Sequence, residues 1–283
     1  MKTLKLMMYA VIATAMVALA QAQDNRTIRI ATEGAFPPWN AVDTSGNPVG
    51  FDIDVGAALC ERAELDCEFQ TQAWDGIIPG LTVGKYDAVM AGMSITEKRK
   101  QVIAFSNPYA LTSNYFVVRK SLDLPALDDS VRIDLSSETE KGKRALQALK
   151  ENLKGTTIGV QGSTNAEAFV QAHLSDEVEI RTYDKQDNLN LDLVAGRIDG
   201  GLADFSVWKA FLESQDGASA ELYGPRISGG LFGPGVGIGL RKEDTALASK
   251  FNTAIKSIIA DGTLETISLK WFGTDVVPQP SDN

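Results

Sequence analysis

Apolar and polar positions repeat in a regular order along the first third of the chain. Residues 27–31 alternate with a period of two, which predicts a strand. Residues 51–62 place apolar side chains on successive helical turns, with aspartates where a helix would begin. Strand patterns at 67–70 and 86–91 flank a short helix predicted from residue 76. This order predicts a mainly parallel sheet with helices on both faces.

The same order begins again in the second half. Residues 157–160, 177–180 and 198–202 have strand patterns, and helices are predicted from residue 164 and over 188–195. Two α/β units, each short of an ordinary domain, indicate two lobes.

Two further segments complete this reading. Residues 122–154 are charged, and 138–153 have a helix-forming composition, so we expect a solvated surface insertion of the second lobe. Residues 244–272 carry apolar side chains at helical spacing, interrupted at Gly262, which predicts one or two helices packed on a core. The glycines between 229 and 239 lack phosphate-loop spacing and predict a strand-return segment.

The first 22 residues have the layout of a secretory signal peptide. Two lysines precede an apolar run of about a dozen residues. The small residues Ala20 and Ala22 then stand before the expected cleavage site. The run is short for a membrane span, which takes about 20 residues, although an uncleaved anchor is an alternative. Cleavage after Ala22 is expected, with a second possible site after Ala20. Because Gln23 follows, no lipid-modified cysteine is predicted.

Composition narrows the function classes. The formal net charge of −10 becomes −12 without residues 1–22, because that segment holds two lysines and no acidic residue. An acidic protein repels phosphate backbones, so nucleic acid is not expected as a partner. Cys60 and Cys67 are close enough to form a disulfide in an exported chain, the alternative being two buried thiols. A metal site is not expected, because His173 is the single histidine and no Cys/His cluster exists.

Motifs of common enzymes are missing from the sequence. There is no GxSxG or HExxH, and one histidine in a predicted helix supports no Ser–His or Cys–His mechanism unless it lies in a cleft. These absences argue against hydrolases, although chemistry by carboxylates alone stays open.

The strongest local signals are for binding. The segment from Ala91 to Arg99 follows a predicted strand, and ligands of open α/β sheets bind beyond the carboxyl ends of strands. Its small residues admit a ligand, Ser94 offers a hydroxyl, and Arg99 offers a planar fork for a carboxylate. In the second lobe, residues 161–164 join a strand to a helix start, where N–H groups suit an anion.

Several longer motifs are similar to those of the polar-amino-acid family of periplasmic solute-binding proteins. They follow one another in order over nearly the whole chain after residue 22: Gly50–Leu59 (GFDIDVGAAL), Trp74–Leu81 (WDGIIPGL), Ser94-Ile95-Thr96 with Arg99, Phe105-Ser106, Gly162-Ser163-Thr164, Gly196-Arg197 with Asp199, and Gly239–Lys242 with Asp244. The chain most resembles the lysine/arginine/ornithine- and histidine-binding proteins and the octopine- and nopaline-binding proteins. The Cys60 and Cys67 pair resembles the disulfide of that subgroup.

The resemblance implies a role for individual residues. Arg99 would hold a ligand α-carboxylate, helped by Ser94 and the Thr164 N–H, and Asp204 would receive the α-ammonium. Phe36 and Trp74 would enclose the ligand side chain, which adds a cation–π interaction if the side chain is cationic, and Glu33 would meet its distal cation. The predicted ligand-binding set is Glu33, Phe36, Trp74, Ala91, Gly92, Met93, Ser94, Arg99, Gln161, Ser163, Thr164 and Asp204. Asn114 and Asn165 are further candidates.

The chain also departs from the lysine/arginine/ornithine pattern. Ala91-Gly92 stand where those proteins tend to carry two serines, and Phe36 where they carry a tyrosine. These small residues and the insertion at 122–154 are closer to the opine binders, whereas Asp204 is closer to the amino-acid binders, because an opine has a secondary amine and an extra carboxylate. An arginine-like ligand is therefore expected, with octopine or nopaline as the alternative.

The resemblance implies the type II periplasmic binding protein fold, an α/β fold of two lobes joined by two crossover strands. We expect residues 23–111 and 228–283 in lobe 1 and 112–227 in lobe 2, with ligand captured by closure of the cleft. The expected protein is a non-enzymatic periplasmic monomer, without cofactor, that serves an inner-membrane ABC permease and its ATPase. A cyclohexadienyl-type dehydratase on the same fold and a sensory input domain with a separate partner are the other readings.

Overall fold

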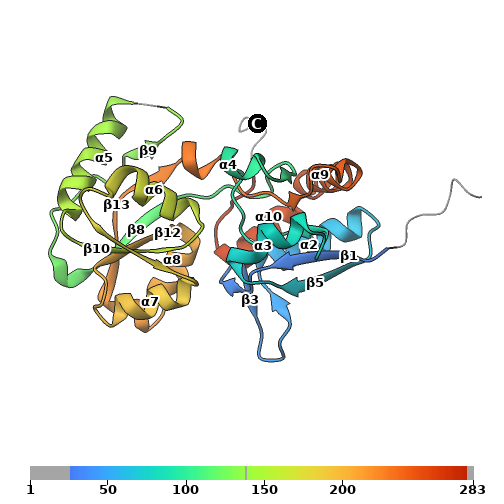
Figure 1. The fold of residues 1–283 in the computed structure, drawn as a ribbon, viewed down its shortest axis with the longest axis horizontal. Coiled ribbons are helices and arrows are strands. Elements are labelled where there is room, and N and C mark those ends of the chain that lie inside the picture. Colours follow the sequence, from blue (N-terminus) through green and yellow to red (C-terminus); the bar gives the residue numbers. More distant parts are fainter. Residues whose placement is uncertain (1–25, 138, 279–283) are drawn as a thin grey trace, which may run out of the picture.

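Two lobes lie side by side in the computed structural model, which describes residues 26–137 and 139–278 (Figure 1). Each lobe is built on its own sheet, and helices cover both faces of each sheet. The predicted signal peptide lies outside the described residues. Among those residues, every helix is too short or too polar to span a bilayer.

The first lobe contains a mixed five-stranded sheet. In spatial order its strands are β5 (Cys67–Thr71), β1 (Ile28–Thr32), β6 (Ala88–Val89), β14 (Gly239–Leu240) and β7 (Ala104–Phe105). β1 runs parallel to both β5 and β6, as the sequence predicts, whereas β14 is antiparallel to both of its neighbours. A small antiparallel sheet of β2 (Ala35–Phe36), β3 (Asn40–Val42) and β4 (Pro48–Val49) lies beside it.

Alternating residues of these strands enter two cores. Ile28 and Ile30 of β1 pack with one set of helices, and Ala31 faces the opposite side. The first face is covered by α2 (Phe51–Arg62), α9 (Thr245–Ala260) and α10 (Thr263–Phe272), and the second by α3 (Ile77–Thr82). The red helices α9 and α10 from the end of the chain therefore pack against the blue helix α2 from its first quarter (Figure 1). The remaining pieces are the 3-10 helix η1 (Trp74–Gly76) and the short α4 (Glu97–Lys100).

The second lobe has a six-stranded mixed sheet. Its spatial order is β11 (Glu179–Tyr183), β10 (Thr157–Gln161), β12 (Gly200–Asp204), β8 (Asn114–Arg119), β13 (Ala220–Ser228) and β9 (Arg132–Asp134). The first three strands are parallel, and β8 is antiparallel to both neighbours. One face packs on α5 (Glu140–Leu153) and α6 (Asn165–Leu174), the other on α7 (Gln186–Val194) and α8 (Phe205–Leu212). Short 3-10 helices lie at η2 (Lys120–Leu122), η3 (Asp216–Ser219) and η4 (Gly230–Phe232).

The segment 122–154 is more than the solvated insertion that its charge predicts. Its strand β9 pairs in parallel with β13 and extends the sheet by one strand. Ile133, Leu149 and Leu153 are fully or almost fully buried in the lobe core. The widely spaced apolar residues among many charges conceal this contribution, because only one face of α5 and one residue of β9 turn inward.

Two extended segments run between the sheets, around residues 106–113 and 229–238. They touch each other through a single bridge between Val236 and Ala110, and Val236 makes a second bridge with Ser94. The predicted lobe boundary at 111/112 falls between strands of the two sheets. The boundary at 227/228 falls one residue inside β13, which ends at Ser228. The boundaries themselves remain predictions.

Candidate functional site

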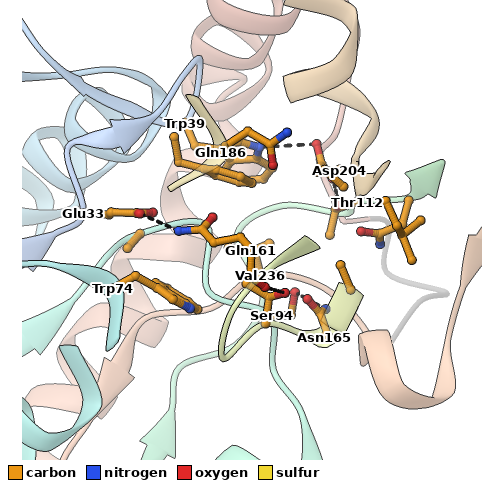
Figure 2. A pocket seen from close by; sticks show the side chains of 18 of the residues that line it. Glu33, Trp39, Trp74, Ser94, Thr112, Gln161, Asn165, Gln186, Asp204 and Val236 are labelled. Carbon is orange, nitrogen blue, oxygen red and sulfur yellow. Dashed lines mark hydrogen bonds between the residues drawn. The ribbon is translucent and has the colours of Figure 1, made fainter. Parts of the chain in front are cut away.

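A cavity lies between the two lobes and is lined by both (Figure 2). About 50 Å³ within it is accessible to the centre of a water-sized sphere, so the lining side chains already stand close together. The lining residues are Glu33, Phe36, Trp39, Trp74, Ala91, Gly92, Ser94, Arg99, Thr112, Asn114, Gln161, Thr164, Asn165, Ala166, Gln186, Leu202, Ala203, Asp204 and Val236.

Strand direction explains why these residues converge. Glu33 follows β1, η1 with Trp74 follows β5, and Ala91 and Gly92 follow β6, so the first lobe contributes the carboxyl ends of three parallel strands. The second lobe contributes Gln161 and Asp204, the last residues of β10 and β12. Parallel strands end at one edge of a sheet, and both such edges face the cavity.

Arg99 is a buried cation without a carboxylate partner. Its guanidinium donates to the Ser94 carbonyl at 2.9 Å and to the Ser163 carbonyl at 3.5 Å, and lies 5.1 Å from the centre of the Trp74 ring. No described carboxylate lies within ion-pair distance. Burial lowers the pKa of Arg99 to about 10, so the guanidinium remains protonated at neutral pH.

Asp204 is a buried anion that starts helix α8. Its Oδ1 accepts from the Ser206 N–H at 2.8 Å, from the Ser206 hydroxyl, and from the Trp39 indole N–H at 3.4 Å, while Oδ2 accepts from the Thr112 hydroxyl. Burial raises the pKa of Asp204 despite these donors. No described basic group pairs with it, so a cation in the cavity would be its first ionic partner.

Glu33 is the second anion of the cavity. It is 8% exposed, and burial raises its pKa to about 7, opposed mainly by the hydrogen bond from Gln161. Lys185 also lowers this pKa through its charge, whereas Asp187 and Asp75 raise it. Glu33 is therefore partly ionised at neutral pH, and a cation beside it would ionise it fully.

Aromatic rings line the first-lobe side. Phe36 and Trp74 both face the cavity, as the sequence analysis expects. Trp39 adds a third ring, 2% exposed, packed edge-on against Phe51 and tilted against Phe272. These rings provide apolar walls between the charged groups.

Besides the Arg99–Ser163 and Trp39–Asp204 bonds described above, further hydrogen bonds connect the lobes directly across the cavity. The Gln161 amide donates to Glu33 at 2.7 Å, and the Asn165 amide donates to the Ser94 hydroxyl at 3.0 Å (Figure 2). The Trp74 indole donates to the Ser163 carbonyl at 3.3 Å. The Trp39 indole donates to the Ser206 hydroxyl at 2.8 Å. The lobes are thus in mutual contact at both ends of the cavity.

Ten of the twelve predicted site residues line the cavity, and two do not. Met93 is fully buried in the core beside α3, in one cluster with Ile77 and Leu81 of that helix. Ser163 presents its backbone carbonyl to Arg99 and Trp74, and its N–H is bonded to the Glu167 carboxylate at 2.8 Å.

The sequence analysis missed several lining residues. They are Trp39, Thr112, Ala166, Gln186, Leu202, Ala203 and Val236. Trp39 stands three residues after Phe36, and its polar ring edge was a usable signal. Gln186 opens α7 at the end of the β11 turn and is 1% exposed, a burial that composition does not reveal. Leu202 lies inside β12 and reads as an ordinary core residue, and the others are small or lie in crossovers, where no local pattern marks them. Of the further candidates, Asn114 and Asn165 do line the cavity.

Two other sequence features have clear positions. Cys60 and Cys67 form a disulfide that joins the end of α2 to the start of β5. His173 lies in α6 with its ring 4.8 Å from that of Phe169, and it is not among the residues that line the cavity.

Two lobes, each an α/β sheet, with a charged cavity between the ends of their strands define a solute-binding protein. The chain matches the family model "Bacterial extracellular solute-binding proteins, family 3" over residues 28–274. It belongs to that family.

Named relatives cover nearly all of the chain. It is 38% identical to the octopine-binding periplasmic protein of Rhizobium meliloti, over 91% of this chain and 94% of the relative. It is 34% identical to the L-arginine-binding protein of Pseudomonas aeruginosa, over 96% and 98%. Among solved structures, an ancestral arginine-binding protein bound to arginine superposes with a TM-score of 0.73 at 33% identity, covering 87% of this chain and 98% of that one. These matches are to binding proteins, and the two-lobed fold is shared with them.

Proposed function

We propose that the protein captures a basic amino acid of the arginine type in the cavity and delivers it to an ABC importer. The charge of the cavity carries this proposal. Arg99 supplies one positive charge, and Glu33 and Asp204 supply two negative charges, none of them paired with an opposite charge from a described residue. The complementary ligand has one carboxylate and two cationic groups, as a basic amino acid does.

The carboxylate and the α-ammonium of such a ligand each have a partner residue in the cavity. The α-carboxylate binds Arg99, with the Ser94 hydroxyl beside it, and the α-ammonium binds Asp204. The Thr164 N–H at the start of α6 also has no partner among the described residues, and it suits the carboxylate.

The side chain of the ligand extends toward Glu33. Its distal cation replaces the Gln161 amide as the partner of Glu33, since Gln161 now occupies that position. Phe36 and Trp74 enclose the stem of the side chain. A cation at a buried carboxylate gains more than an amide does, because charge-assisted hydrogen bonds are about twice as strong as neutral ones.

The rest of the proposal concerns the setting. The chain is exported to the periplasm, loses residues 1–22, and acts as a monomer that presents its ligand to an inner-membrane permease with its ATPase. The periplasmic relative and the family support this setting. Ligand favours the closed arrangement because only there can both lobes touch it.

Isothermal titration calorimetry tests the ligand. Arginine, lysine, ornithine, histidine, glutamine, octopine and nopaline are titrated in turn into the refolded protein, since refolding removes co-purified ligand. Arginine-type ligands are expected to bind at least tenfold more tightly than glutamine, which leaves Glu33 without a cation. Equal or tighter binding of glutamine would contradict the proposal.

Octopine is the second candidate, because the 38% identical relative is named for it. The Asn114 amide, 5% exposed, lines the cavity next to Asp204 in the paired strand and could meet an additional carboxylate. Asp204 favours the primary ammonium of an amino acid over the secondary amine of an opine. A primary ammonium has three N–H groups, so one can bind Asp204 even when solvent and the ligand itself use the other two. The same titrations decide between the two.

We further propose that the protein does not transform its ligand. Glu33 is the residue through which a dehydratase activity would be tested. It is a buried acid with a pKa near neutrality, the property that a general acid of such an enzyme would require. Incubation with prephenate or arogenate, followed by chromatography, is expected to give no aromatic product. Turnover that disappears in a Glu33→Gln variant would show an enzyme instead.

A further inference from the structure

Behind the cavity, a third buried carboxylate, after Glu33 and Asp204, belongs to no ion pair among the described residues. Asp52, in the first turn of α2, is fully buried and does not line the cavity. Its Oδ2 accepts from the Gly92 backbone N–H at 2.8 Å and from the Asn40 amide at 2.9 Å. Its Oδ1 accepts from the Tyr109 hydroxyl at 2.6 Å.

These three donors lead to three separate walls of the site. Gly92 lines the cavity itself, with a φ of +57° that favours glycine. Asn40 in turn accepts from the Gly34 N–H at 2.7 Å and so holds the turn that follows Glu33. Tyr109 lies in the crossover that carries Thr112 into the cavity. One carboxylate therefore connects the β1 turn, the β6 turn and a crossover.

Asp52 is suited to this task at neutral pH. Burial raises its pKa to about 6, opposed by its three hydrogen bonds, so it is ionised and all of its lone pairs can accept. The N-terminus of α2 also favours a negative charge at this position.

From this geometry we infer that Asp52 is a positioning residue of the ligand site, which sets the places of Gly92 and of the turn holding Glu33. The inference rests on the proposed function only for the choice of ligand in its test. An alternative role is stability alone, and the two roles differ in what a substitution does to affinity.

The chain offers a matched control for the test. Asp87 is another buried carboxylate of the first lobe, at the opposite end of β6, where it pairs with Arg26, Arg29 and Arg241. Asp87→Ala and Asp52→Ala each remove one buried carboxylate, but only the second releases turns at the cavity. Asp52→Asn keeps one oxygen for Gly92 and Asn40, and its amide can donate to the Tyr109 oxygen.

Arginine affinity and melting temperature are measured for wild type and all three variants. Asp52→Ala is expected to weaken binding about tenfold or more, which corresponds to the loss of one or two charge-assisted hydrogen bonds. Asp52→Asn should stay within about threefold of wild type, and Asp87→Ala should melt lower but bind as wild type does. Binding by Asp52→Ala within twofold of wild type, or equal weakening by Asp87→Ala, would overturn the inference.

Two additions keep the test decisive. If Asp52→Ala does not fold, Asn40→Ala releases the Gly34 turn alone and should weaken arginine binding about threefold, and unchanged binding would overturn the inference. If wild type binds none of the panel, the proposed function fails, and hydrogen exchange of the Gly34 and Gly92 amides decides instead. Exchange that is faster in the Asp52→Ala protein, but not in the Asp87→Ala protein, supports the positioning role, and unchanged exchange refutes it.

Discussion

At the scale of single residues, the cavity is characterised by charges that form no ion pair with any residue the structure describes. Arg99, Asp204 and Glu33 are each at most 9% exposed, and burying an unpaired charge costs several kcal/mol. Hydrogen bonds from neutral groups offset part of that cost, as the donors around Asp204 show. An amino acid that brings the opposite charges offsets the remainder, so affinity and specificity have the same origin.

Substitution of Arg99 by alanine should abolish tight binding without unfolding the protein. Loss of one partner of a buried charge pair weakens binding by about 2 kcal/mol or more, at least thirtyfold. The free variant should melt at or above the wild-type temperature, because an unpaired buried charge has been removed. Calorimetry and circular dichroism measure the two effects, with Arg181→Ala on the exposed face of β11 as the control. Retained tight binding would refute the role of Arg99.

Binding of arginine should depend on pH through Glu33. Its pKa of about 7 in the free protein means that acid neutralises it, so affinity should fall about tenfold between pH 7.5 and 6. A Glu33→Gln variant should bind more weakly at pH 7.5 and with a flatter pH profile. Calorimetry at several pH values measures both slopes, and identical slopes would contradict the assignment.

The same group should affect stability with the opposite sign. The pKa of Glu33 rises from 4.5 to about 7 on folding, so its contribution is complete below pH 4.5 and is lost as pH rises toward 7. The free energy of unfolding of ligand-free wild type should therefore fall across this window relative to Glu33→Gln. Urea denaturation at pH 4.5 and 7.5 measures the difference, and a parallel course of the two proteins would count against the raised pKa.

Sequence reasoning reached the main charged residues but not their contacts. Arg99 and Asp204 follow strand patterns, where ligand groups of α/β sheets lie, and family motifs mark them. The Gln161–Glu33 bond joins residues 128 positions apart in different lobes, and no local pattern encodes how the lobes meet. Met93, a predicted ligand-binding residue, packs in the core beside α3, and the turn after β6 carries no period that shows which side chains face the core.

At the scale of elements, periodicity predicted the long helices and the five-residue strands well. β1, β5 and α2 begin and end within a residue or two of the predicted ranges. Two-residue strands such as β14 carry no period, and they form because neighbouring strands supply partners. The strand β9 was missed for the same reason, since its pairing with β13 depends on residues almost a hundred positions away.

The disulfide should affect stability and leave binding unchanged. It ties the end of α2 to β5, with a sequence separation of 7 between the cysteines, and neither cysteine lines the cavity. A Cys60→Ser/Cys67→Ser variant should lose about 2–3 kcal/mol of unfolding free energy, the value expected for so small a loop. Urea denaturation measures this loss, with calorimetry of arginine binding as the control. Weakened binding in the folded variant would place the disulfide in the function of the site.

At the scale of the whole molecule, the two lobes make one site that neither has alone. Asp204 and Gln161 come from the second lobe, and Glu33 and Arg99 come from the first. The sequence predicted this division through its repeated α/β order. The family resemblance implied the two crossovers, but no sequence pattern predicted the contact of Trp39 with Ser206, because that contact depends on the final angle between the lobes.

The order of strands in the first sheet has a consequence for how the chain can acquire its structure. β14 lies between β6 and β7, yet it follows the entire second lobe in the chain. The second sheet uses one continuous stretch and can assemble as soon as that stretch is made. The first sheet cannot be completed until residues 239–240 have been synthesised. This delay suits the export proposed above, because the first lobe cannot fold completely while most of the chain is still being made.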